Sequence, residues 1–244
     1  MEAMMEVVVV RNENSVIERL WATIEKLATE SIAKRSVFRV GLSGGSLIKY
    51  MATGAKKCQT DWSKWELYFC DERFVDESDD DSTFGQYKKL FIPKTSLNES
   101  QFIIINRSLS LDECAEDYER QICEKFAVDK STDRTIPQFD LLLLGMGPDG
   151  HTCSLFPDHA LLAEKHRLIA PISDSPKPPP ERITMTYPLI NNAKVCMFPI
   201  SGKGKADMVK RIVKDEEALP ARRVKPTQGK LIWLLDEDAA SACN

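Results

Sequence analysis

Short apolar runs separated by polar, glycine-rich segments recur along the whole chain. A run of four to eight apolar residues that ends at turn residues is typical of a strand buried on both faces of a sheet. The clearest is Phe139–Leu144, which places four consecutive leucines before Gly145. The predicted strands are residues 7–10, 36–42, 65–69, 102–105, 139–144, 168–171, 183–187, 194–200 and 230–235.

Helical spacing of apolar residues appears between these runs. Residues 14–34 repeat apolar side chains every three or four positions, and residues 111–126 form a second predicted helix. Further helices are predicted to start at residue 47, around residues 208–213 and at residues 236–240. Alternating strands and helices predict an α/β fold, a single doubly wound and mostly parallel sheet with helices on both faces. We expect residues 1–244 to form one domain.

The segment Ser43-Gly44-Gly45-Ser46 lies between a predicted strand and a predicted helix. Backbone N–H groups at a helix N-terminus lack partners, and the helix dipole adds positive potential, so phosphate is the usual ligand of such a turn. The alternative is an ordinary tight turn in which a serine caps the helix, and this motif alone leaves both open. Neither a Walker A sequence nor a GxGxxG fingerprint is present, so neither a nucleotide nor NAD is indicated.

Two other predicted strand ends carry charged residues. Asp71, Glu72 and Arg73 follow residues 65–69, and Lys203 and Lys205 lie in the segment SGKGKA at 201–206. A solvated ion pair is the ordinary explanation for the first group, whereas lysines at a glycine-rich turn suit a phosphate.

The proline-rich segment 173–180 precedes the predicted strand at residues 183–187. It contains too many prolines for a helix or a central strand. The segment is either a linker or a rigid arm that fixes Arg182 over a site.

The loop after Phe139–Leu144 contains two titratable side chains, Asp149 and His151. Ligands bind at the carboxyl edge of open α/β sheets, where this loop is expected to lie. His151 is a candidate general base and Asp149 a candidate residue to orient it. A single histidine after a glycine-rich turn is more often structural, so the loop needs support from elsewhere in the chain.

Composition limits the possible functions. The formal net charge of −4 and the isoelectric point near 5.6 argue against a nucleic-acid-binding protein. No run approaches the roughly 20 apolar residues of a membrane span, and the N-terminus lacks the features of a signal peptide. The seven cysteines form no CxxC pair, which indicates reduced thiols and a cytoplasmic protein. We expect the protein to bind neither a membrane nor a nucleic acid.

Longer sequence blocks carry a specific resemblance. GMGPDGHTCSLFP at 145–157 closely resembles the signature of the 6-phosphogluconolactonase family, whose fold is similar to that of glucosamine-6-phosphate isomerases. The other blocks that resemble this family occur in the family's order and are LSGGS at 42–46, CDERFV at 70–75, DDSTFG at 80–85, ISDSPKPPPERITMT at 172–186 and SGKGKA at 201–206. The stand-alone, eukaryotic, cytosolic members are the most similar.

This resemblance implies an activity and a set of site residues. The family hydrolyses 6-phospho-D-glucono-1,5-lactone to 6-phospho-D-gluconate, the second step of the oxidative pentose phosphate pathway. By position, His151 matches the family histidine proposed to activate water, with Asp149 as its possible orienting partner. The positions that match the expected anion and ligand contacts are Arg73, Arg182, Lys205, Gly44, Gly45 and Ser46. We expect a monomeric enzyme that uses no cofactor and no metal and binds a small phosphorylated sugar lactone.

Two other functions compete with this interpretation. The first is an isomerase and deaminase of glucosamine 6-phosphate, a family that shares the fold and the phosphate motifs. After His151 this chain has no carboxylate until Asp158, which argues against that chemistry, although Asp71 and Glu72 remain available for a proton shuttle. The second is a sugar-phosphate sensor without catalytic activity, which only a turnover measurement separates from an enzyme.

Overall fold

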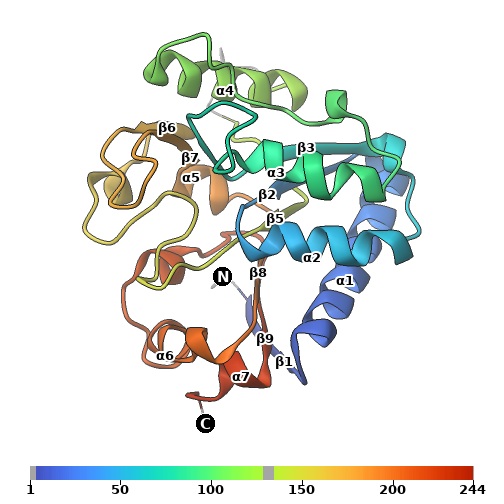
Figure 1. Ribbon diagram of the computed structural model, residues 1–244, viewed down its shortest axis with the longest axis vertical. Helices are drawn as coiled ribbons and strands as arrows, with labels where there is room; N and C mark the ends of the chain where they lie inside the picture. The colour runs from blue at the N-terminus through green and yellow to red at the C-terminus, as the bar shows by residue number, and fades with distance from the viewer. Residues whose placement is uncertain (1–3, 129–134, 244) are drawn as a thin grey trace.

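The computed structural model describes residues 4–128 and 135–243. Within these ranges, a six-stranded sheet runs through the middle of the molecule (Figure 1). Its strand order is β1-β9-β8-β5-β2-β3, and every neighbouring pair is parallel. The strands are β1 (Met4–Val10), β2 (Phe38–Leu42), β3 (Trp65–Phe69), β5 (Leu141–Leu143), β8 (Val195–Ile200) and β9 (Lys230–Asp236). The predicted parallel α/β architecture is confirmed.

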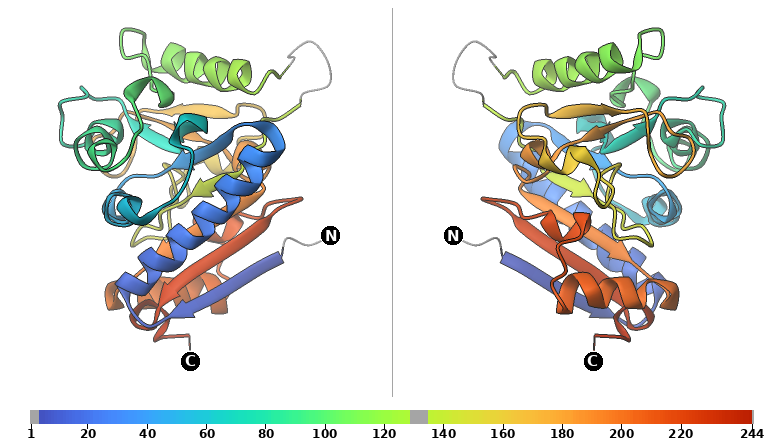
Figure 2. Two further views of the ribbon diagram at one scale, coloured as in Figure 1. Left: turned by 90° about the vertical axis from the view of Figure 1, so that its right-hand side faces the viewer. Right: turned by 90° about the vertical axis from the view of Figure 1, so that its left-hand side faces the viewer.

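Helices cover both faces of this sheet because its central strands are apolar on both sides. Leu141 and Leu143 pack with α1 (Glu13–Arg35), α2 (Ser46–Gly54) and α3 (Thr83–Leu90). The intervening Leu142, with Leu144, packs into a second core on the opposite face. That core receives the remaining helices, namely α4 (Leu111–Lys125), α5 (Tyr187–Ile190), α6 (Ala206–Val209), which continues as the π-helical turn Lys210–Lys214, and α7 (Glu237–Ala240). Figure 2 shows α1 lying across one face of the sheet.

A second, antiparallel sheet was not predicted from the sequence. It has three strands in the order β4-β7-β6, namely β4 (Asp71–Arg73), β6 (Ile169–Ile172) and β7 (Arg182–Met185). The pairing places Arg73 directly opposite Arg182. Two cationic residues more than a hundred positions apart in sequence are therefore adjacent.

One predicted strand is wrong. Residues 102–105 form no strand, and only Phe102 makes an isolated bridge, to Leu67 of β3. Phe102 and Ile103 are buried whereas Ile104 is 40% exposed, so this apolar segment packs along the sheet edge without continuing it. The described residues include no helix both long and apolar enough to cross a membrane.

Candidate active site

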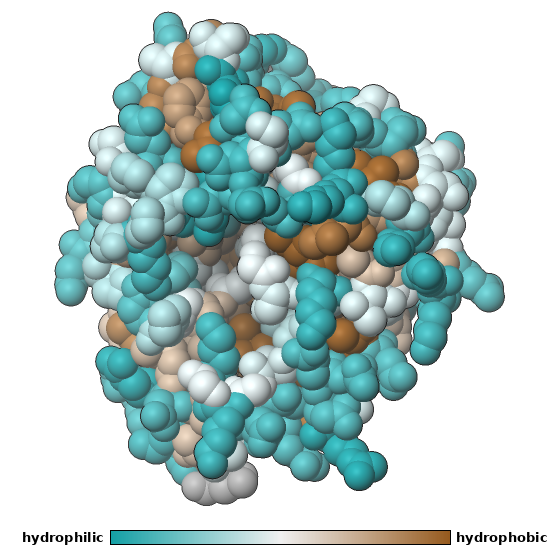
Figure 3. All heavy atoms as spheres, viewed as in Figure 1, coloured by the Kyte–Doolittle hydropathy of each residue, from teal (hydrophilic) through white to brown (hydrophobic). Residues whose placement is uncertain are grey.

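A cavity of about 190 Å³ opens where the loops after β2, β5 and β8 meet the small sheet. Its lining includes the candidate base His151 and all of the predicted anion and ligand contacts, which are Gly44, Gly45, Ser46, Arg73, Arg182 and Lys205. Asp149 does not line the cavity but contacts His151. The structure therefore brings the predicted residues together. Hydrophilic residues cover most of the face seen in Figure 1, with smaller apolar areas between them (Figure 3).

The histidine loop, residues 145–157, folds tightly around the imidazole. The backbone N–H of Gly147 donates to the carbonyl of His151 at 2.9 Å, and the N–H of Gly150 donates to the carbonyl of Gly147 at 3.1 Å. The ring of Phe156 lies 4.6 Å from the imidazole, centroid to centroid. A Cβ at Gly147 would stand 2.0 Å from Cε1 of His151, so only glycine leaves room for the ring.

Asp149 fixes the tautomer of His151. Its Oδ1 lies 2.5 Å from Nδ1 of the ring, a distance that requires a proton between two atoms that otherwise repel each other as acceptors. Nδ1 therefore carries the hydrogen in the neutral ring, and Nε2 keeps its lone pair. Burial and the positive charge of Lys177 hold the pKa of His151 below its ordinary value, although Asp149 opposes them. Burial would raise the pKa of Asp149, but hydrogen bonds from His151 and Lys177 lower it to about 2.

Lys177 is a site residue that the sequence analysis did not identify. Its Nζ lies 3.0 Å from Oδ1 of Asp149 and 3.1 Å from Nδ1 of His151. The residue lies in the proline-rich segment 173–180, which we call the proline arm. The sequence does contain one signal for this role: Lys177 is the only lysine of segment 173–180 and precedes the predicted site residue Arg182 by five positions.

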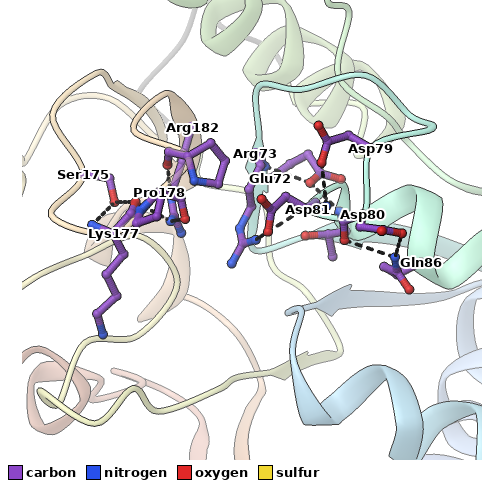
Figure 4. Close-up of polar contacts among 12 residues, drawn as sticks. Glu72, Arg73, Asp79, Asp80, Asp81, Gln86, Ser175, Lys177, Pro178 and Arg182 are labelled. Carbon is purple, nitrogen blue, oxygen red and sulfur yellow. Dashed lines mark hydrogen bonds and ion pairs between the residues drawn. The ribbon is translucent and has the colours of Figure 1, made fainter.

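Arg182 holds the proline arm against the small sheet. Its Nε donates to the carbonyl of Pro179 at 3.0 Å, and its Nη2 donates to the carbonyls of Lys177 and Pro178 at 2.8 and 3.1 Å. The residue is only 2% exposed, and burial and the nearby Arg73 lower the pKa of its guanidinium. Figure 4 shows these contacts, with the side chain of Lys177 extending away from the arm. The interpretation of the segment as a rigid arm beside Arg182 therefore fits the observed contacts better than a linker.

The buried carboxylate of Glu72 fixes the backbone at Arg73. Glu72 accepts hydrogen bonds from the backbone N–H groups of Arg73, Thr83 and Phe84 at 2.7–2.8 Å, which ties β4 to the beginning of α3. Burial raises the pKa of Glu72 to about 7, although these hydrogen bonds oppose the shift. Nη1 of Arg73 donates to the carbonyl of Asp81 at 3.2 Å, and Figure 4 shows the two residues together with Glu72.

The glycine loop, residues 43–46, presents backbone to the cavity at the beginning of α2. Gly45 has a φ of +70°, a conformation that favours glycine, and no atom lies within 4 Å of the position a Cβ would take. Lys205 reaches the same cavity from a 3₁₀ turn, Lys203–Lys205, and donates to the carbonyl of Met146 at 2.8 Å. Burial and Lys177 lower the pKa of Lys205.

Asp71 also lines the cavity, in a place that the sequence could not specify. It is 7% exposed, and its Oδ2 accepts a hydrogen bond of 2.8 Å from the hydroxyl of Ser154. This bond joins the histidine loop to the small sheet. Among residues 4–128 and 135–243, no group of three or more His, Cys, Asp or Glu side chains is arranged to hold a metal ion.

The fold and the site together define an α/β protein whose cavity, at the carboxyl edge of a parallel sheet, combines a histidine with several cationic side chains. The family described as "Glucosamine-6-phosphate isomerases/6-phosphogluconolactonase" matches residues 11–233. The chain belongs to this family.

Curated relatives are similar over nearly the whole chain. The 6-phosphogluconolactonase of Homo sapiens is 45% identical over 235 residues, which cover 91% of this chain and 89% of the human protein. That of Bos taurus is 48% identical over 210 residues, covering 83% of this chain and 80% of the bovine protein. A probable 6-phosphogluconolactonase of Drosophila melanogaster is 45% identical, covering 93% and 91% of the two chains.

Solved structures have the same fold. The 6-phosphogluconolactonase of Thermotoga maritima superposes with a TM-score of 0.80 at 25% identity, covering 95% of this chain and 99% of its own. A monomeric glucosamine-6-phosphate deaminase superposes with a TM-score of 0.78 at 19% identity, covering 98% of this chain and 100% of its own. The second likeness shows that the two chemistries share this fold, so the fold does not choose between them.

Proposed function

We propose that this protein is a 6-phosphogluconolactonase, a carboxylic ester hydrolase that converts 6-phospho-D-glucono-1,5-lactone to 6-phospho-D-gluconate. The observation that carries the proposal is that His151, Arg73, Arg182 and Lys205 all line one cavity. In that cavity Nε2 of His151 is unprotonated, because the proton is on Nδ1. The high identity to curated 6-phosphogluconolactonases over most of the chain supports the same reaction.

In the proposed reaction, Nε2 of His151 acts as the general base. It takes a proton from a water molecule while the water oxygen bonds to C1 of the lactone. The resulting tetrahedral oxyanion collapses, the bond between C1 and the ring oxygen breaks, and the ring oxygen takes the proton back from Nε2. Asp149 holds Nδ1–H throughout and stabilises the imidazolium that forms between the two proton transfers.

The cationic side chains and the glycine loop are assigned to the substrate's negative charges: Arg73 to the phosphate, and the others to the phosphate or to the charge that develops on the oxyanion. Arg73, Arg182 and Lys205 supply positive charge, and the beginning of α2 at Gly44–Ser46 supplies backbone N–H groups. Positive groups fixed in a confined site stabilise an oxyanion more effectively than water does. No covalent nucleophile is needed because a lactone carbonyl is already electrophilic.

Three finer properties belong to the same proposal. We expect residues 1–244 to fold as one domain, to remain monomeric and to act in the cytoplasm. Absence of a membrane-spanning helix in the described residues is compatible with that location. Light scattering on the purified chain measures its mass in solution, and one cooperative unfolding transition is expected from one domain.

One experiment tests the reaction class. The purified protein is incubated separately with 6-phosphogluconolactone and with glucosamine 6-phosphate. We expect lactone loss well above the spontaneous rate, and no ammonia from the amino sugar. Ammonia and fructose 6-phosphate without lactone turnover would mean that the protein is a deaminase. No turnover of either substrate would favour the sugar-phosphate sensor without catalytic activity.

A further inference from the structure

We propose that Lys177 is a positioning residue for His151: its ammonium group orients Asp149 and keeps the imidazole neutral until the base is needed. This inference rests on the proposed function, since it concerns the same base. The inference is based on the mutual contact of three side chains: Nζ of Lys177 lies 3.0 Å from Oδ1 of Asp149 and 3.1 Å from Nδ1 of His151.

The geometry decides which hydrogen bonds these groups make. Nδ1–H of His151 and the ammonium group of Lys177 both donate to Oδ1 of Asp149. A bond from Lys177 to a bare Nδ1 is excluded because Nδ1 and Oδ1, only 2.5 Å apart, would then face each other without a proton. The 3.1 Å contact between Lys177 and Nδ1 is consequently an approach of two donors. It becomes less favourable when the ring acquires a positive charge.

Lys177 is held in place by its backbone. The carbonyl of Lys177 accepts hydrogen bonds from Nη2 of Arg182 at 2.8 Å and from the hydroxyl of Ser175 at 2.9 Å. The backbone N–H of Lys177 donates to the same serine oxygen at 3.3 Å. Arg182 is 2% exposed, so its bonds anchor the proline arm to the buried part of the small sheet. The anchored arm places the ammonium group of Lys177 next to His151.

The charges around His151 explain why such a lysine is useful. Asp149 from the histidine loop and Asp71 from β4 both favour the imidazolium, and Lys177 from the proline arm opposes them. Arg73, Arg182 and Lys205 add further positive charge to the cavity wall. With Lys177 present, the ring rests as a free base, and the imidazolium formed during water attack readily returns its proton to the ring oxygen. Without it, the two carboxylates are opposed only by burial and by the other cations of the cavity wall, and the ring is more easily protonated at rest.

The test is a pH titration of the histidine Cε1–H signals by NMR in the wild-type protein and in Lys177→Met. The chain contains three histidines, and the His151 signal is identified by its absence from His151→Gln. We expect the pKa of His151 to rise when Lys177 becomes methionine and to remain near the wild-type value in Lys177→Arg. The acid limb of the kcat/KM profile is expected to move to higher pH in the methionine variant by the same amount.

A matched control removes a remote lysine in the same way. Lys56 is exposed and lies in the 3₁₀ turn that follows α2, so Lys56→Met lowers the net charge equally without touching the site. An unchanged His151 pKa in Lys177→Met, or an equal rise in Lys56→Met, would overturn the inference. A higher KM with no change in the titration would assign Lys177 to substrate binding instead and would also overturn it. The NMR titration needs no turnover, so failure of the lactone assay is distinguishable from failure of this inference.

Discussion

The histidine loop and the glycine loop follow neighbouring parallel strands, β5 and β2, yet they are built in opposite ways. In the histidine loop, a Cβ at Gly147 would lie 2.0 Å from the imidazole, so glycine is required there for space. In the glycine loop, no atom lies within 4 Å of a Cβ at Gly45, and glycine is favoured there by its φ of +70°. The first loop is packed around the His151 ring, whereas the second is open toward the cavity.

We interpret this difference as a division of work between the two loops of the proposed active site. A general base must be held in one position and one tautomer before the substrate arrives, and Asp149, Phe156 and Gly147 confine the His151 ring as that proposed role requires. A phosphate brings its own acceptors, so a loop that binds it needs only unoccupied donors. Changes in the histidine loop are therefore expected to lower kcat, and changes among the anion contacts to raise KM.

The largest effect is expected from His151→Ala. Loss of a general base typically costs about 10²–10⁴-fold in rate, so kcat for the lactone should fall by that factor. Binding of the product 6-phosphogluconate, measured by calorimetry, should change little because the anion contacts remain. Turnover near the wild-type value in the folded variant would remove His151 from the mechanism.

Gly147→Ala should come next. Its new methyl group would overlap Cε1 and Nδ1 of His151, at 2.0 and 2.1 Å, and must displace the ring. Misplacement of a catalytic group by about 1 Å can cost roughly 10²-fold in kcat. The control is Gly204→Ala, because no atom lies within 4 Å of that Cβ position. Equal kcat in the two variants would show that packing around the imidazole does not matter for turnover.

Sequence patterns specify the histidine loop better than its neighbours. An apolar strand followed by a glycine-rich turn can be read locally, and β2, β5 and both loops were placed correctly in this way. The small sheet could not be predicted, because β4 has three residues and its register with β7 is set by packing between distant segments. Lys177 was missed for the same reason, since its distance to His151 depends on how the proline arm folds back. The erroneous strand at residues 102–105 shows that an apolar run alone does not guarantee strand pairing.

A smaller effect concerns the pH dependence of the wild-type enzyme. A general base works only when unprotonated, so kcat/KM falls as the pH falls through the pKa of His151. Burial and Lys177 lower that pKa, and the acid limb should therefore have its midpoint below about 6.5, the ordinary value for histidine. Initial rates from pH 4.5 to 8, corrected for spontaneous hydrolysis, measure it. A midpoint well above 6.5 would contradict the described balance of charges.

No effect is expected from chelation. The proposed water activation uses His151 alone, and the described residues hold no cluster of metal-ligating side chains. Prolonged treatment with a chelator, followed by measurement of metal content and lactone turnover, checks this prediction. Activity that is lost and then restored only by added zinc would contradict it.

The division of work is tested most directly by Arg73→Met assayed on two substrates. Arg182 is less suitable because its side chain also anchors the proline arm. A charge-assisted contact is worth about 1.5–3 kcal/mol, so KM for 6-phosphogluconolactone should rise roughly 10- to 150-fold. The much slower hydrolysis of unphosphorylated glucono-1,5-lactone should be unchanged, since that substrate lacks the group Arg73 is assigned to bind. Equal loss on both lactones, or a fall in kcat with KM unchanged, would contradict the account.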